Sequence, residues 1–214
     1  MIPGLRQEYQ NFNPQATSPL VDKYLSHITL GNEEMLKTLK DVCKNSLLGT
    51  PTNRLYVFVN SKGSSGTTCF MQMMREIIEC YFFEKFVADM EKIKSGYYGA
   101  TRPLPVSKMI YCDSNETEHH LKSKSGLIKL LLAKEEMFVG DRIIKPNCQL
   151  VFICDREPTD LCPGLKARIV PIHFNACFTR NPQNENERQA DLNIVNKIMN
   201  VRNNVDAFIN WILS

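Results

Sequence analysis

The chain has 214 residues, of which 43% are hydrophobic and 23% are charged. This composition supports one sizeable core and excludes a wholly disordered chain. The net charge of +3 is mildly basic and does not by itself indicate nucleic-acid binding. No apolar stretch approaches the roughly 20 residues of a membrane-spanning helix, and the polar N-terminus lacks the apolar middle of a signal peptide. We therefore expect an intracellular protein that is not secreted and has no membrane partner.

Eight cysteines are scattered along the chain, and none of them forms a C-x-x-C pair. Cys112 and Cys154 lie inside apolar runs, which favours buried, reduced thiols over a zinc site. His119 and His120 are adjacent, and neighbouring residues of a helix point to different sides. We therefore predict a structural or exposed role for this histidine pair.

The N-terminal quarter of the chain predicts an irregular arm followed by two helices. Residues 1–18 are rich in Asn, Gln and Pro, and residues 19–48 follow a helical pattern. Ser18 is suited to cap the first helix because its hydroxyl can accept a backbone hydrogen bond, and Pro19 is typical of a first turn. Gly31 separates the two helices, and Gly49 follows the second.

A strand, a small-residue loop and a helix follow in that order. Residues 54–60 are apolar and β-branched or aromatic, which is typical of a buried strand. The loop occupies residues 61–66, and Thr67 opens a helical stripe that continues to Tyr81. This order is typical of a phosphate-binding unit.

Later segments continue the alternation of strands and helices. We predict helical structure at 116–133, a basic hairpin at 135–146 with Gly140 and Asp141 in its turn, a polar loop at 175–186, two helices within 187–213, and buried strands at 108–113, 149–155 and 167–174. Strands separated by helices predict an α/β fold with a mostly parallel central sheet flanked by helices.

The loop at residues 61–66, with the two threonines that follow it, partly matches the phosphate-loop pattern G-x-x-x-x-G-K-[ST]. Gly66 and Thr68 match it, but Ser61 replaces the first glycine and Thr67 replaces the lysine. The lysine normally places a positive charge between the β- and γ-phosphates, which threonine cannot do. The candidate nucleotide-binding residues are Ser61, Lys62, Gly63, Ser64, Ser65, Gly66, Thr67 and Thr68. The motif alone is equally compatible with an ordinary serine-glycine turn.

The order of the later elements carries a more specific resemblance. Residues 126–174 run from a lysine-bearing helix through a hairpin into a strand, then to Pro158, Arg168 and the P-x-x-F of residues 171–174. Together with the ending VDAFINWILS, this resembles the superfamily 3 helicases of DNA viruses, especially the primase-helicase type of large DNA viruses. The resemblance covers about residues 50–214.

This resemblance implies an AAA+-like P-loop NTPase domain at residues 50–214, preceded by an N-terminal arm and helical segment at residues 1–49. It implies an ATP- and Mg²⁺-dependent DNA helicase motor in viral genome replication. The implied partners are single-stranded or forked DNA, other replication proteins and further copies of the chain in a hexameric ring. The implied location is the host nucleus or a cytoplasmic viral replication site.

Four residues take catalytic roles by this resemblance. Asp113 matches the acid that helps to hold Mg²⁺ with Thr68, although an aspartate there can instead cap the next helix. Glu116 is the nearest acid for activating water. Asp155 stands where the family has a sensor asparagine, and an aspartate would repel phosphate.

The fourth residue, Arg168, matches the arginine that reaches a neighbouring subunit's nucleotide. Arg156 and Lys166 are competing candidates, and an ordinary surface arginine is the alternative. The predicted hairpin region carries Lys134, Arg142 and Lys145, which by the resemblance contact DNA phosphates. The alternative is that these basic side chains are simply solvated.

Two other functions remain open from the sequence. Thr67 and Asp155 replace catalytic residue types, so the chain can be a pseudo-ATPase of the same fold that binds DNA or supports assembly without turnover. An unrelated α/β binding protein with an ordinary loop is the other alternative.

Overall fold

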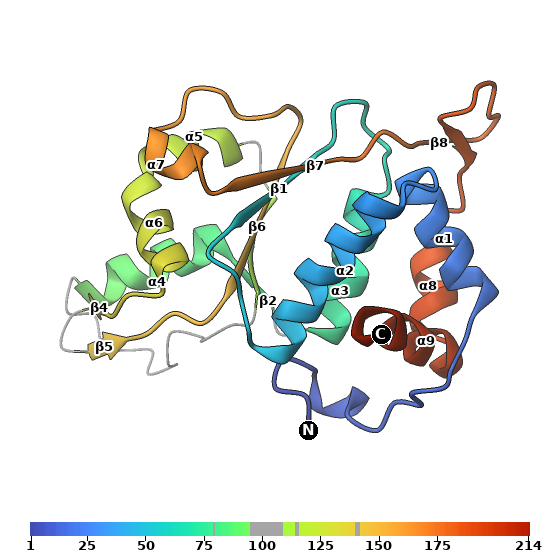
Figure 1. Cartoon of the computed structure of the whole chain (residues 1–214), viewed down its shortest axis with the longest axis horizontal. Helices are drawn as coiled ribbons and strands as arrows, with labels where there is room; N and C mark the ends of the chain where they lie inside the picture. The colour runs from blue at the N-terminus through green and yellow to red at the C-terminus, as the bar shows by residue number, and fades with distance from the viewer. Residues whose placement is uncertain (79, 95–108, 114–115, 140–141) are drawn as a thin grey trace.

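The computed structural model describes residues 1–78, 80–94, 109–113, 116–139 and 142–214. At its centre lies a five-stranded sheet with the strand order β2-β3-β6-β1-β7 (Figure 1). The strands are β1 (Leu55–Val59), β2 (Cys80–Phe82), β3 (Met109–Cys112), β6 (Gln149–Cys154) and β7 (Ile169–His173). The pairings between these strands are all parallel, so their carboxyl ends lie at one edge of the sheet.

Strand β1 lies inside the sheet and is buried along its whole length. Its side chains alternate between two cores because successive strand residues point to opposite faces. Tyr56 and Phe58 belong to one core, and Leu55, Val57 and Val59 belong to the other. This arrangement explains why the strand is a continuous apolar run rather than an alternating one.

Helices cover both faces of the sheet (Figure 1). One face carries α1 (Pro19–Thr29), α2 (Glu33–Leu48), α3 (Thr67–Ile77), α8 (Ile194–Met199) and α9 (Arg202–Leu213). The other face carries α4 (Phe83–Lys94), α5 (Thr117–Ser123), α6 (Ser125–Ala133) and α7 (Pro163–Lys166). The predicted α/β architecture with a mostly parallel, helix-flanked sheet is confirmed.

Capping residues mark where the first two helices begin and where the second ends, and the roles of Ser18 and Gly49 were expected from the sequence. Ser18 caps α1 by accepting a hydrogen bond from the backbone N–H of Val21 at 3.3 Å. Asn32 caps α2, and Gly49 ends α2 in the left-handed conformation with φ 66°. The arm before α1 contains a short 3-10 helix, η1 (Gln7–Tyr9).

The predicted helical stripe from Thr67 to Tyr81 is wrong in its last turn. Helix α3 ends at Ile77, and Ile78 is extended and forms an antiparallel bridge with Leu5. Tyr81 instead belongs to the edge strand β2, which pairs with β3. Because β2 has only three residues, it is too short to show the alternation that identifies a strand.

Two further segments differ from the predictions. The expected polar loop contains β8 (Cys177–Thr179), and the expected helical region begins with β9 (Glu187–Gln189), which pairs with β8 in parallel. The predicted hairpin is confirmed by the antiparallel strands β4 (Met137–Val139) and β5 (Arg142–Ile144). Its predicted turn at residues 140–141 lies outside the described residues. Among the helices that the structure describes, none combines the length and apolarity needed to cross a bilayer.

Candidate nucleotide-binding site

The loop between β1 and α3 departs from ordinary backbone geometry at three residues. Gly63, Ser64 and Gly66 have φ values of 63°, 46° and 84°. Gly66 immediately precedes α3, and a Cβ atom built there would lie 3.0 Å from side-chain atoms of both Ile28 and Phe178. Both the positive φ and the close neighbours therefore require glycine at this position.

Hydrogen bonds from distant segments hold this loop. The backbone N–H of Phe178 in β8 donates to the carbonyl of Ser64 at 2.8 Å. The hydroxyl of Tyr24 in α1 donates to the carbonyl of Gly66 at 3.2 Å. Helix α1 and strand β8 therefore help to hold the loop at the amino end of α3.

The two threonines that open α3 point in different directions. Thr67 is buried, and its hydroxyl lies 2.7 Å from the hydroxyl of Ser65. Thr68 is exposed and lines a cleft beside the loop. Thr67, which the sequence pattern aligns with the lysine of a phosphate loop, is therefore a neutral side chain turned into the protein, while Lys62 is exposed on the loop.

The cleft has a volume of about 470 Å³ and lies at the carboxyl ends of β1, β3 and β6. Its lining comprises Asn60, Thr68, Asp113, Thr117, Glu118, Ile153, Cys154, Asp155 and Arg156. The chain leaves β1 through α3 on one face of the sheet, whereas the β6–β7 connection runs through α7 on the other face. Crevices at such a reversal of strand order are the usual ligand sites of open α/β sheets.

Asp113 follows β3 and has an altered electrostatic environment. Partial loss of water around its carboxyl raises its pKa above the ordinary value, and the nearby Glu84 carboxylate raises it further. Arg75 acts in the opposite direction, and Asp155 adds a smaller increase. These acids therefore repel one another, and a cation between Asp113 and a bound phosphate would relieve this repulsion.

The cleft offers oxygen atoms of the kind that Mg²⁺ prefers. Thr68 contributes a hydroxyl, Asp113 a carboxylate and Asn60 an amide oxygen. The Asn60 amide oxygen is buried, and no hydrogen-bond donor reaches it from the described part of the chain. A magnesium ion with its water ligands would supply such donors, so these residues fit the ion that the sequence implies.

Asp155 lies in the same cleft as Asp113, next to Arg156. The guanidinium of Arg156 lies 3.0 Å from the carboxylate of Glu118. This ion pair joins the segment after β6 to α5, and Glu118 raises the pKa of Arg156 through a hydrogen bond and its charge. The cleft therefore has three acids and one arginine in its lining.

Glu116 is directed away from this set of acids. It precedes α5, and its carboxylate lies 3.9 Å from Nε2 of His120. The acid that α5 directs into the cleft is Glu118. The structure therefore brings Thr68, Asp113 and Asp155 together in the cleft, whereas the Glu116 carboxylate lies beside His120.

The remaining predicted catalytic and DNA-binding residues whose side chains are described do not line the cleft. Arg168 precedes β7, at the amino edge of the sheet, and its Nη1 donates to the carbonyl of Lys129 at 3.3 Å. Lys134 follows α6, and its ammonium donates to the carbonyl of Pro51. Lys145 is exposed after β5. Arg142 begins β5, and its side chain lies outside what the structure describes.

Sequence reasoning missed Asn60, Glu84, Thr117 and Glu118. Asn60 directly follows a predicted buried strand, and this position was a usable signal because parallel strands end at one edge. Glu84 gave no such signal, since it lies after the predicted helical stripe, which ended at Tyr81, and before the strand predicted at 108–113. Glu118 is one of two acids in the segment ETEHH, and only the orientation of α5 distinguishes them.

Comparison with known proteins gives a fold relationship without a family. No protein-family description and no curated protein matches the chain. An A-form apo structure of the C-terminal region of NrS-1, residues 305–718, is similar with a TM-score of 0.65 and 11% identity over 97% of this chain and 48% of that one. A second A-form structure of the region gives a TM-score of 0.61 at 11% identity over 95% and 47%.

A third apo structure of this region has a TM-score of 0.61 at 11% identity over 94% of this chain and 48% of that one. The chain therefore spans about half the length of these solved structures. At this level of identity, the similarity establishes a shared fold alone, and any activity has to be argued from the chemistry of the cleft.

Proposed function

We propose that this chain is a Mg²⁺-dependent NTP-binding domain of the P-loop class. The observation that carries the proposal is the common cleft of Thr68, in the first turn of α3, and Asp113, which directly follows β3. Backbone N–H groups at the start of α3 would hold the phosphates, and the helix dipole would add attraction. Thr68 and Asp113 would hold the ion through oxygen atoms.

The acids of the cleft make the ion necessary for nucleotide binding. Asp113 and Asp155 would both repel a triphosphate, and the buried Thr67 gives no compensating charge. A bound Mg²⁺ would reduce this repulsion and would link the phosphates to Asp113. We therefore expect very weak nucleotide binding in the absence of a divalent cation.

A second pocket, lined in part by Gly66, would take the base. It has a volume of about 170 Å³, and its lining is mainly apolar, with Leu20, Tyr24, Cys69, Phe178 and Ile194 among the residues that form it. Ligand pockets typically combine such a lining with a few polar groups that fix orientation. Here Gln189 and Asp191 supply polar groups to the lining.

Titration of the chain with a non-hydrolysable ATP analogue, with and without MgCl₂, tests the proposal. The Asp113→Asn variant should bind the Mg²⁺ complex at least about tenfold more weakly, a loss of about 1.4 kcal/mol. The matched control is Asp160→Asn, because this carboxylate is exposed and lies outside the cleft. Equal affinity with and without Mg²⁺ would contradict the assignment.

Filling the second pocket tests the base position separately. Cys69→Trp should weaken binding of the ATP analogue but leave binding of inorganic triphosphate with Mg²⁺ unchanged, because triphosphate has no base. Equal losses for both ligands would instead indicate damage to the phosphate loop.

The more specific role that we propose is the motor of a superfamily 3-type DNA helicase in viral genome replication. The order of elements from the loop to the final helix supports this role. Arg168 lies at the amino edge of the sheet, away from the cleft of its own chain, so it could act only on the nucleotide of a neighbouring copy in a ring. DNA-stimulated hydrolysis by the oligomer that is lost in Arg168→Ala would support this role.

The buried Thr67 favours a second candidate, a domain that binds Mg²⁺-nucleotide without hydrolysing it. The lysine that usually follows the γ-phosphate to the transition state has no counterpart at this position. Measured binding with no turnover, in the presence and absence of single-stranded DNA, would favour this candidate over the motor.

A further inference from the structure

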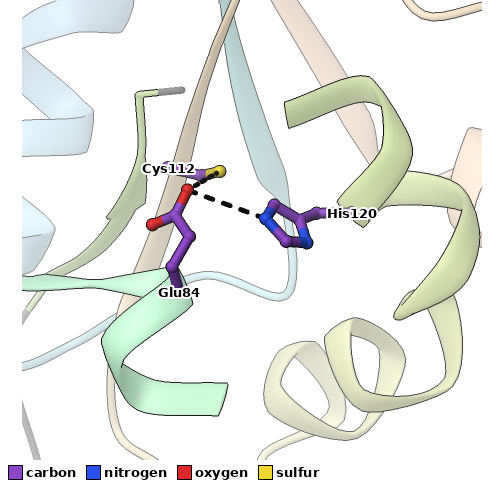
Figure 2. A group of neighbouring side chains, drawn as sticks. All are labelled: Glu84, Cys112 and His120. Carbon is purple, nitrogen blue, oxygen red and sulfur yellow. Dashed lines mark hydrogen bonds and ion pairs between the residues drawn. The ribbon is translucent and has the colours of Figure 1, made fainter. Parts of the chain in front are cut away.

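Three side chains with metal-binding atoms converge beside the end of β3. Glu84 comes from the start of α4, Cys112 from the end of β3, and His120 from α5 (Figure 2). One carboxylate oxygen of Glu84 lies 3.0 Å from the Cys112 sulfur and 3.8 Å from Nε2 of His120. The three ligand atoms lie within 4.8 Å of one another.

These separations are close to those around a bound transition metal. Zinc binds sulfur, nitrogen and oxygen ligands at about 2.0–2.3 Å in a tetrahedron, so its ligand atoms are about 3.5 Å apart. Small side-chain adjustments would therefore bring the three ligand atoms of this group around one ion. The backbone does not need to move, because the three side chains already face a common point (Figure 2).

His120 gives an independent reason to expect a ligand. Its side chain is 12% exposed, and neither ring nitrogen has a hydrogen-bond partner within the described part of the chain. A buried polar atom that makes no hydrogen bond lowers the stability of the fold. A metal ion would satisfy Nε2, which points toward Glu84, and the edge-to-face contact with Phe83 holds the ring in this orientation.

The surroundings of Cys112 also suit a metal-bound thiolate. Its sulfur is buried, and the hydroxyl of the buried Thr117 lies 3.4 Å away. The hydroxyl can donate to the sulfur, and such outer contacts orient and tune metal ligands. Glu84 is 35% exposed, so the group is open to solvent on one side for the entry of an ion and a water ligand.

We propose that Glu84, Cys112 and His120 bind one zinc-class divalent transition-metal ion, with water as the fourth ligand. On binding, the S–H bond of Cys112 breaks, its proton passes to solvent and a sulfur–metal bond forms. His120 donates the Nε2 lone pair and keeps its proton on Nδ1, and Glu84 donates a carboxylate oxygen. The ion clamps α4, β3 and α5 together.

This site is chemically distinct from the Mg²⁺ site proposed at Asp113. A thiolate and an imidazole are ligands for zinc, cobalt and related ions, whereas Mg²⁺ takes oxygen ligands. The inference therefore does not depend on the proposed nucleotide binding, and the two ions can be told apart by competition.

Cobalt provides the probe. The full chain is treated with a chelator, desalted and titrated with CoCl₂. We expect one ion per chain, a near-ultraviolet thiolate-to-cobalt charge-transfer band, loss of the band on adding one equivalent of ZnCl₂, and no loss with excess MgCl₂. Zinc should also raise the thermal unfolding midpoint, because it binds the folded chain.

Variants separate this site from the other thiols and histidines. Cys112→Ala should abolish the charge-transfer band, and Glu84→Gln and His120→Gln should each weaken cobalt binding by at least about 100-fold, since loss of outer contacts alone costs 10–100-fold. His119→Gln is the matched control. This neighbouring histidine is exposed and is absent from the cluster, so the variant should bind cobalt as tightly as the wild-type chain.

Circular dichroism and urea unfolding first establish that each variant folds. If Cys112→Ala does not fold, Glu84→Gln and His120→Gln decide, because both changes preserve side-chain size closely. The proposal is overturned if the folded wild-type chain gives no cobalt–thiolate band, or if the band persists in a folded Cys112→Ala variant. It is also overturned if His119→Gln weakens binding as much as His120→Gln.

Discussion

The hydroxyl of Thr67 lies 2.7 Å from the hydroxyl of Ser65, and both residues are buried. The adjacent Thr68 is exposed and lines the cleft at the ends of β1, β3 and β6. Two successive threonines of one helix therefore have different roles. The first stabilises the loop from inside, and the second presents a hydroxyl to the proposed Mg²⁺-nucleotide.

Valine substitutions at these two positions should separate stability from binding. Thr67→Val removes a buried hydroxyl and its hydrogen bond, so we expect a loss of about 1–2 kcal/mol in the free energy of unfolding, measured with urea. Thr68→Val should change the stability by less than about 0.5 kcal/mol, because the side chain is exposed. It should instead weaken binding of the Mg²⁺-bound ATP analogue. The reverse pattern would contradict the assigned orientations.

Lys62 is the cation of the loop that remains available to the phosphates. It is exposed, and the position of the usual lysine is taken by Thr67. We expect Lys62→Ala to weaken Mg²⁺-bound analogue binding about tenfold at low salt and less at high salt, because exposed charges are screened. Lys37→Ala, an exposed lysine on α2, is the control. Equal affinities of the two variants would show that Lys62 does not contact phosphate.

Local signals in the sequence were sufficient to predict most of the fold. The caps at Ser18 and Gly49 and the apolar runs of β1, β3 and β6 were all visible, because each depends on neighbouring residues. Strand β2 was not visible, since it has only three residues and its central residue, Tyr81, continues the spacing of the helical stripe of α3. Its position is determined by pairing with β3, which is a long-range contact.

The candidate site could be predicted only in part, for a similar reason. Thr68 was proposed from the phosphate-loop pattern and Asp113 from the family resemblance, and the structure brings both to one cleft. The orientation of α5, which selects Glu118 over Glu116, is a tertiary property with no local signal. The metal-ligand group was missed because Glu84, Cys112 and His120 lack short spacing, and 28 residues separate the first two.

Asp206 joins the N-terminal arm to the final helix. Its side chain is buried, one carboxylate oxygen accepts a hydrogen bond from the backbone N–H of Asn13 at 3.0 Å, and the other lies 2.8 Å from Nε of Arg202. The second contact is a close ion pair rather than a hydrogen bond, since that oxygen has no hydrogen-bond donor of suitable geometry within the described residues.

Removing this carboxylate should loosen the arm. We expect Asp206→Ala to lower the free energy of unfolding by about 2 kcal/mol, because the Asn13 N–H and the half-exposed Arg202 lose a charged partner. Proteolysis within residues 1–18 should also become faster. Asp41→Ala, at an exposed position of α2, should change stability by less than about 0.5 kcal/mol. Similar losses in both variants would exclude a special role for Asp206.

Burial of Cys148 makes the stability of the fold sensitive to alkaline pH. The thiol is 4% exposed, and burial raises its pKa from 9.0 to about 12. Because the folded state holds this proton more tightly than the unfolded chain, the contribution to stability is complete below pH 9. It is lost as the pH rises from 9 toward about 12, at about 1 kcal/mol per pH unit.

Urea unfolding at pH 8 and pH 10, with a reductant present, measures this loss. The wild-type chain should lose more stability between the two values than Cys148→Ala, by about 1 kcal/mol, because alanine has no proton to release. The cavity left by the substitution lowers the stability of the variant equally at both pH values, so it cancels when each protein is compared with itself. Other titrating groups contribute equally to both proteins, so they cancel when the two losses are compared. A matched loss in the two proteins would show that Cys148 ionises as readily when folded as when unfolded.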